Sequence, residues 1–487
     1  MRSGPGRRIG VAGGRPPRDL PRVCVPCGVW NRWGIDRHRA GSRHFGAAGQ
    51  SDFAMAADPP DAAQGIVNRL TCRCHLPPAS PSIVQASWRT FFEQTLADLE
   101  QRNLRRFRGG LPASGNATGR RDRTDHFAAP VPPSSSTAPS FLDFGSNDYL
   151  GLRDHPEVVR AVRQAAAAGS GASPVLRGYT DVQRGLETEL AQWSGQDSGL
   201  VFSSGYSGNL GVLSCLVGSE DLILSDRLNH ASLIDGCRLS RATIGVFPHR
   251  EAGYVDTYLR NNRHRFRRVI VLTESVFSMD GDAAPLSDLL EITAHRDAAL
   301  VVDEAHAVGV YGHRGAGLLE ELGGQSAVLL KLGTLSKALG AAGGYAVGES
   351  PAIEYLVNRC RSYVFSTAPS PAVLAAARTS LRLLQHMHAQ RQALRARSIA
   401  LRERLRAIGA QVPSGDAPIV PVILGGEDRV LAIARQLLHQ GIYVPAIRPP
   451  TVPVGACRLR ISLSTRHTAE DLDRLLAALR PALDSIH

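Results

Sequence analysis

The stretch 334–340, Thr-Leu-Ser-Lys-Ala-Leu-Gly, begins about thirty residues after the stretch 300–306, Leu-Val-Val-Asp-Glu-Ala-His. In the earlier stretch, a short apolar run ends directly at an acidic residue. Apolar runs that alternate with helical segments and end in polar turns are typical of a mainly parallel α/β sheet. Ligands bind at the carboxyl ends of strands in such sheets. The two stretches therefore indicate both the fold class and the place of a site.

The same alternation extends from about residue 141 towards the C-terminus, which predicts an α/β protein of two domains. We predict a large domain over 141–380 and a smaller α+β domain over 381–487 that begins with a long Arg-rich helix. The clearest predicted strands of the large domain are 200–202, 222–224, 269–272, 300–302 and 328–330, and those of the smaller domain are 419–424 and 458–463.

The N-terminal part has a different character. Residues 1–80 are rich in Gly, Pro, Arg and Ala, so we predict a disordered leader there. Residues 81–140 are predicted to form one amphipathic helix, from Trp88 to about Phe107, and a Gly/Ser/Pro-rich linker over 109–140. The basic end of that helix, with Arg105, Arg106 and Arg108, either completes the helix C-terminus or meets an anionic substrate.

The composition is that of a soluble globular protein, with 43% hydrophobic and 21% charged residues among 487. The net charge of +12 is concentrated in residues 1–50, which hold ten arginines and two aspartates. We therefore expect no nucleic-acid partner. No apolar run is long enough for a transmembrane helix, so we expect no membrane partner and a cytoplasmic location.

The eight cysteines divide equally between the leader and the body of the chain. The body cysteines are far apart in sequence and are predicted to be small buried hydrophobes in a reducing compartment. Cys24 and Cys27 with Cys72, Cys74 and His75 could hold zinc in principle, but the second group is too closely spaced for the usual ligand pattern. We therefore expect no metal site.

Only two lysines, Lys331 and Lys337, stand among the 56 Lys and Arg residues. A guanidinium stays protonated, whereas a buried ammonium can lose its proton and act as a nucleophile. A lysine that is kept in so Arg-rich a chain is therefore a candidate for imine chemistry, and Lys337 has the better surroundings of hydroxyls and glycines. The alternative is that both lysines are ordinary surface residues.

Three other strand ends offer complementary groups. The loop at Gly205 and Tyr206 opens an apolar helix whose free N–H groups suit a phosphate. His230 follows a buried strand and could face an aromatic ring, and Asp303 could pair with a protonated heterocyclic nitrogen. Each group alone has a structural alternative, such as a helix N-cap aspartate or a core histidine. Together with Lys337, they match the requirements of pyridoxal phosphate (PLP).

From about residue 87 to the C-terminus, the chain resembles the α-oxoamine synthase family of fold-type I PLP enzymes. The motifs that carry this resemblance occur in order at 147–152, 229–232, 276–282, 303–306 and 334–337. The segment 446–453, Ala-Ile-Arg-Pro-Pro-Thr-Val-Pro, most resembles the branch that joins L-alanine to a pimeloyl thioester in biotin synthesis.

The resemblance implies a role for each matching residue. Lys337 would form the imine, Asp303 would pair with the pyridine nitrogen, His306 would bond the ring hydroxyl and His230 would stack on the ring. The remaining implied contacts are Gly205, Tyr206, Ser278 and Thr334 to the cofactor, and Arg105, Asn147, His230, Thr451 and Arg460 to the substrates. Ser366 and Thr367 match a segment that the family lends to the neighbouring subunit, which implies a homodimer with shared active sites.

One departure concerns the loop 169–178, where Ala172 and Pro174 replace part of the family's glycine-rich run. Proline fixes φ and removes an N–H, so the fit of the acyl chain near this loop is open. The resemblance implies that L-alanine and a pimeloyl thioester, on CoA or acyl carrier protein, give 8-amino-7-oxononanoate, CO₂ and free thiol. The alternatives are a sister synthase that uses glycine or serine, and a non-catalytic protein with the same fold.

Overall fold

The computed structural model describes residues 83–106 and 141–484 of the chain. The predicted leader 1–80, with Cys24, Cys27, Cys72 and Cys74, and the predicted linker 109–140 lie outside the described residues. The described residues 83–106 and 141–484 belong to one compact unit. No helix within the described ranges is long and apolar enough to cross a membrane.

The predicted N-terminal helix is present, but it ends earlier than expected. Helix α1 spans Ile83–Gln101. The chain leaves it through Asn103, whose φ of 53° is left-handed, and the N–H groups of Leu104 and Arg105 both bond to Leu99 O. A left-handed residue after the last turn is a common way to end a helix. Arg105 therefore lies beyond the helix and does not complete its last turn.

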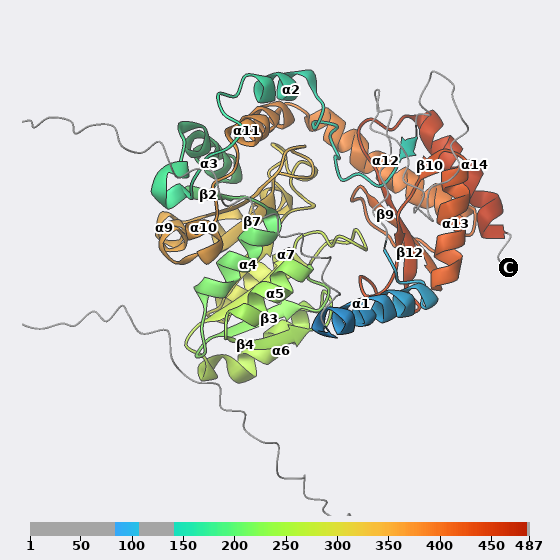
Figure 1. Cartoon of the computed structure of the whole chain (residues 1–487). Coiled ribbons are helices and arrows are strands. Elements are labelled where there is room, and N and C mark those ends of the chain that lie inside the picture. Colours follow the sequence, from blue (N-terminus) through green and yellow to red (C-terminus); the bar gives the residue numbers. More distant parts are fainter. Residues whose placement is uncertain (1–82, 107–140, 485–487) are drawn as a thin grey trace, which may run out of the picture. The chain divides into compact units, whose positions relative to one another are not determined.

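The central sheet has seven strands in the order β2-β8-β7-β6-β5-β3-β4 (Figure 1). Only β8 runs antiparallel to its two neighbours, so the prediction of a mainly parallel sheet is confirmed. The strands are β2 (Ser198–Phe202), β3 (Leu222–Asp226), β4 (Thr243–Phe247), β5 (Val269–Glu274), β6 (Ala299–Asp303), β7 (Leu330–Thr334) and β8 (Gly344–Gly348).

The central strands consist mainly of Val, Ile and Leu because both faces of the sheet are buried. Three of these strands end in an acidic residue, namely Asp226 on β3, Glu274 on β5 and Asp303 on β6. The register pairs Glu274 directly with Asp303. The sheet therefore gathers carboxylates at the edge where its strand ends meet the site.

Helices and short helical turns connect these strands. They are α2 (Pro156–Arg163), η1 (Pro174–Gly178), α3 (Asp181–Ser194), α4 (Gly205–Leu216), α5 (Ala231–Leu239), α6 (Ala252–Asn262), η2 (Arg263–Arg265), α7 (Leu286–His295), α8 (Leu318–Glu321), η3 (Gln325–Ala327), α9 (Ser350–Arg359), α10 (Arg361–Val364) and α11 (Pro371–Gln385). Pro174 begins the turn η1, where a Cβ on Gly178 would lie 2.1 Å from Ala172 O. Glycine is therefore required at that end of the loop.

The C-terminal part contains a second, smaller sheet of three strands in the order β11-β12-β9. Helices α12, α13 and α14 lie beside it (Figure 1). Its elements are α12 (His388–Ala407), β9 (Ile419–Gly425), α13 (Glu427–His439), β11 (Ala446–Ile447), β12 (Cys457–Ser462) and α14 (Ala469–Asp484). The domain boundary at residue 381 stays a prediction, and that residue lies inside α11.

A two-stranded parallel pair connects the start of the described core to its C-terminal part. Strand β1 (Leu142–Asp143) pairs with β10 (Ile442–Tyr443). The following residues carry the chain through the motif 147–152. The pair therefore places Asn147 near β12, where Arg460 bonds to it.

Candidate active site

Lys337 lies three residues after β7, and its amine meets a histidine from the neighbouring strand end. The distance from Lys337 Nζ to His306 Nε2 is 2.7 Å. Burial lowers the pKa of the Lys337 amine to about 8, although the nearby carboxylates of Asp303 and Glu274 act to raise it. An amine with such a pKa is partly neutral near physiological pH, which imine chemistry requires.

A chain of polar contacts extends from His306 to the smaller sheet. His306 Nδ1 lies 2.7 Å from the hydroxyl of Tyr149, which lies 3.3 Å from Asn147 Oδ1. Arg460 donates to the same Asn147 oxygen at 3.1 Å. Burial, followed by the charge of Lys337, holds the pKa of His306 well below its usual value. The chain thus joins the predicted carboxylate-binding arginine to the predicted reactive amine through a neutral histidine.

Asp303 ends β6 and is 5% exposed. One of its oxygens accepts from Asn209 Nδ2 at 2.6 Å, and the other accepts from Ala305 N at 2.9 Å. Because donors reach both oxygens, the ionised carboxylate is stabilised despite its burial. Asn209, on α4, was not among the predicted site residues, although it lies in the loop-helix segment that predicted a phosphate site.

His230 is the N-cap of α5, and its Nδ1 accepts from Ser232 N. Its peptide N–H donates to Glu274 Oε1 at 2.6 Å, so the end of β5 fixes the histidine backbone. The side chain is exposed, while loss of water on its protein side lowers its pKa, a shift that Asp303 opposes. An imidazole that is anchored in this way and open on one side suits contact with a flat ring.

The N-terminus of α4 forms a cradle for an anion. Ser204 caps the helix in a capping box with Ser207. A Cβ on Gly344 would lie 2.5 Å from Gly205 Cα, and a Cβ on Gly205 would lie 3.3 Å from Thr334 Oγ1. Glycines at both positions keep side chains out of the space around the helix end, so its backbone N–H groups and the Thr334 hydroxyl fit a phosphate. The Tyr206 hydroxyl bonds to Asp235.

The buried amine, the doubly bonded Asp303 carboxylate and this helix end together fit PLP. Lys337 would hold its carbonyl carbon, Asp303 its ring nitrogen and the α4 N-terminus its phosphate. Ser278 belongs to the same region, because its carbonyl accepts from Arg460 Nε at 2.6 Å. The individual contacts of these residues with a cofactor stay predictions.

The two predicted acyl-substrate contacts do not bond to each other. Arg105 pairs with Glu100 at 2.6 Å, whereas its neighbour Arg106 donates to Thr451 Oγ1 at 3.1 Å. Arg448 donates to Asn103 O at 2.7 Å, and burial followed by the charge of Arg106 lowers its pKa. Arg106 belongs to the basic helix end that the sequence offered to an anionic substrate, but neither Arg106 nor Arg448 was named as a site residue, because only the contact with the C-terminal part shows which arginines meet Thr451.

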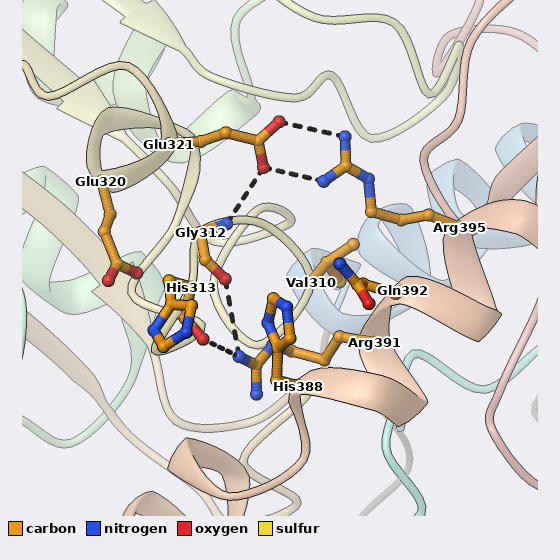
Figure 2. A pocket seen from close by; sticks show the side chains of 9 residues that line it. All are labelled: Val310, Gly312, His313, Glu320, Glu321, His388, Arg391, Gln392 and Arg395. Carbon is orange, nitrogen blue, oxygen red and sulfur yellow. Dashed lines mark hydrogen bonds and ion pairs between the residues drawn. The ribbon is translucent and has the colours of Figure 1, made fainter.

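A pocket of about 430 Å³ lies beside α12, apart from the residues described so far (Figure 2). None of the predicted site residues lines it. Arg391 on α12 donates hydrogen bonds to the carbonyls of Gly312 and His313, and Arg395 forms an ion pair with Glu321. Among the described residues, no group of three or more His, Cys, Asp or Glu side chains is placed to hold a metal ion.

Comparison with known proteins identifies the family. The model of the aminotransferase class I and II family matches residues 139–479. The chain is 45% identical to the 8-amino-7-oxononanoate synthase of Cellvibrio japonicus over 350 residues. These residues cover 71% of this chain and 87% of that protein. It is 44% identical to the enzyme of the same name from Geobacter sulfurreducens, over 69% of this chain and 86% of that protein.

Solved structures agree with this result. Serine palmitoyltransferase of Sphingomonas wittichii has a TM-score of 0.69 and 35% identity, over 71% of this chain and 88% of that one. The 8-amino-7-oxononanoate synthase of Francisella tularensis has a TM-score of 0.62 and 26% identity, over 71% of this chain and 98% of that one. The predicted fold type is thus confirmed. The chain belongs to the aminotransferase class I and II family and, within it, to the PLP-dependent 8-amino-7-oxononanoate synthases.

Proposed function

We propose that the protein condenses L-alanine with a pimeloyl thioester and releases 8-amino-7-oxononanoate, CO₂ and the free carrier thiol. The observation that carries this choice is the pair Arg106 and Arg448 beside Thr451. The bonded partner of Arg448 is a peptide carbonyl, so its charge has no hydrogen-bonded carboxylate among the described residues. A thioester whose far end carries a carboxylate supplies that partner.

The cofactor is PLP, and when bound it withdraws electrons from the amino-acid α-carbon, which makes that carbon acidic and able to attack a thioester. We assign the removal of the α-proton to Lys337 Nζ, because the lowered pKa of this amine leaves it partly neutral. Arg460, which is 4% exposed, offers its guanidinium to the amino-acid carboxylate. His230 Nε2 is the group we assign to proton transfer when CO₂ leaves and the product carbon is reprotonated.

A substrate screen tests the proposal directly. The purified protein is assayed for CO₂ and free thiol with L-alanine, glycine or L-serine, each combined with pimeloyl-, acetyl- or palmitoyl-CoA. We expect turnover to be highest with L-alanine and pimeloyl-CoA. Higher turnover with glycine and acetyl-CoA, or with serine and palmitoyl-CoA, would assign the chain to a sister activity. A colourless protein that gains no visible absorbance with added PLP would indicate a non-catalytic role.

The two neighbouring arginines provide a matched pair of variants. Arg106→Ala removes the guanidinium that bonds to Thr451, so we expect KM for pimeloyl-CoA to rise about tenfold while KM for L-alanine stays the same. Arg105→Ala, which removes the partner of Glu100, should have a smaller effect. If Arg105→Ala raises KM more than Arg106→Ala does, the assignment of Arg106 is wrong and the residue predicted from the sequence is the contact.

We also propose that the protein acts in the cytoplasm as a homodimer that shares its active sites. The segment with Ser366 and Thr367, predicted to reach a neighbouring subunit, follows Phe365, which is 72% exposed. A large aromatic side chain with that exposure is consistent with a contact between subunits.

Whether the acyl carrier is CoA or acyl carrier protein follows from repeating the substrate assay with both thioesters.

A further inference from the structure

Glu274 is a buried acid that the mechanism above does not use. It ends β5, is 3% exposed, and is the register partner of Asp303 on β6. Side chains at paired positions of adjacent strands point to the same face of a sheet and lie about 5 Å apart. Two carboxyl groups therefore share one poorly hydrated region next to Lys337.

Two such groups do not both ionise easily, because each negative charge opposes the other. The contacts decide which group keeps its proton. Asp303 accepts hydrogen bonds on both oxygens, from Asn209 and Ala305. Glu274 accepts from the peptide N–H of His230 through Oε1, a bond that a neutral carboxylic acid can also accept. The negative charge therefore belongs on Asp303 and the proton on Glu274.

The other charged groups around Glu274 support the same assignment. Burial raises its pKa to about 8, and the charges of Asp303 on β6 and Asp226 on β3 act in the same direction. Lys337 and the N–H of His230 oppose this rise.

We propose that Glu274 is a positioning residue that holds the His230 backbone as an uncharged carboxylic acid, so that Asp303 alone carries the negative charge of this pair of acids. This inference rests on the proposed PLP site. An ionised Glu274 would add a second negative charge beside Lys337 and raise the pKa of its amine. Protonation of Glu274 thus keeps the amine reactive while the strand end still fixes His230.

The proton can be seen directly in the PLP-loaded enzyme. We expect the infrared difference spectrum of wild type minus Glu274→Gln at pH 7 to contain the C=O stretch of a protonated carboxylic acid. The matched control is Glu304→Gln, because Glu304 is also fully buried but forms an ion pair with Lys331. Its difference spectrum should contain carboxylate bands only. Carboxylate bands from Glu274 as well would overturn the proposal.

The pH dependence of stability gives a second readout that does not depend on the substrate. A folded-state pKa raised from 4.5 to about 8 means that the folded protein binds a proton at Glu274 that the unfolded chain releases. The stability of wild type relative to Glu274→Gln should therefore fall as pH rises from about 4.5 to 8. Urea unfolding of both apoproteins at several pH values measures this, and a constant difference would contradict the proposal.

A third measurement separates positioning from general packing. Glu274→Gln keeps an oxygen for the His230 N–H, whereas Glu274→Leu does not. We expect kcat of the Gln variant to exceed that of the Leu variant at least about tenfold at pH 7. The visible absorbance of bound PLP should also lose, in the Gln variant, any pH dependence that comes from residue 274. Equal loss of activity in both variants would show that the N–H contact has no positioning role.

Discussion

The protein has two lysines six positions apart, and the structure places them in opposite situations. Lys331, inside β7, is 1% exposed, forms an ion pair with Glu304 at 3.1 Å and lies over the Trp193 ring at 5.5 Å. Lys337, beyond the end of the same strand, keeps part of its surface accessible and contacts a neutral histidine instead of a carboxylate. A buried charge that has a partner is structural, whereas one that lacks a bonded counter-ion is available for chemistry.

The largest expected effect is on catalysis at Lys337. Lys337→Ala removes the amine, so kcat should fall by about 10⁴-fold or more, and the visible band that the cofactor gains on bonding to the lysine should be lost. Turnover assays and absorbance spectra check this. If the variant keeps both the band and its activity, Lys331 or another amine must carry the chemistry, and the contrast between the two lysines disappears.

The corresponding change at Lys331 should affect stability. Lys331→Met leaves the Glu304 carboxylate buried without its partner, which costs about 3–5 kcal/mol of the free energy of unfolding. Urea unfolding measures the loss, and a Lys331→Met/Glu304→Gln double variant should recover much of it. Folded Lys331→Met protein should still show the cofactor band. If the band is absent, Lys331 has a role in the active site.

The pH dependence of the free energy of unfolding tests whether the buried amine of Lys337 lacks a bonded counter-ion. The lowered pKa of Lys337, about 8 against 10.5, means that the unfolded chain binds a proton more tightly than the folded apoprotein. The stability of wild type relative to Lys337→Met should therefore rise between about pH 8 and 10.5, by about 1–3 kcal/mol after allowance for partial exposure. Denaturant titrations across this range provide the test. A fall over the same range would mean that the folded protein holds the ammonium.

The smallest expected effect concerns His306, the residue that contacts Lys337 in place of a carboxylate, and its bond to Tyr149. Tyr149→Phe removes the hydroxyl that bonds to His306, which should cost about 0.5–1.5 kcal/mol and lower kcat about 2- to 12-fold. Steady-state kinetics of the variant show whether the polar chain to Arg460 matters. The control is Tyr311→Phe, which removes a hydroxyl that bonds to Asp416 and takes no part in the polar contacts between His306 and Arg460.

The sequence was sufficient to predict what depends on local pattern. Apolar runs followed by polar turns located β2, β3, β5 and β6 and placed His230 and Asp303 at strand ends. The strand predicted at 328–330 overlaps β7 only at residue 330, because β7 continues to Thr334. The contact between Lys337 and His306 was not predicted, although both residues follow neighbouring parallel strands whose ends meet at one edge of the sheet. The PLP fold type followed from the resemblance of the ordered motifs to a known family.

What depends on register or on distant contacts could not be predicted in the same way. Glu274 was visible as part of a polar turn, but only its pairing with Asp303 makes it a second acid in the site. The surface alternative for the two lysines was wrong for Lys331, because burial depends on what packs against β7. The end of α1 was misplaced because Arg105 and Arg106 continue a helix-compatible sequence past the left-handed Asn103.

The pairing of β1 with β10 has a consequence for the order in which the protein is made. Residues 142–143 pair with residues 442–443, three hundred positions later, so Asn147 reaches Arg460 only after almost the whole chain has left the ribosome. Contacts of such sequence separation form late in folding. Nascent chains that stop before residue 440 should therefore be cut by protease near residue 147, and protection of that site in such chains would show that the segment docks earlier.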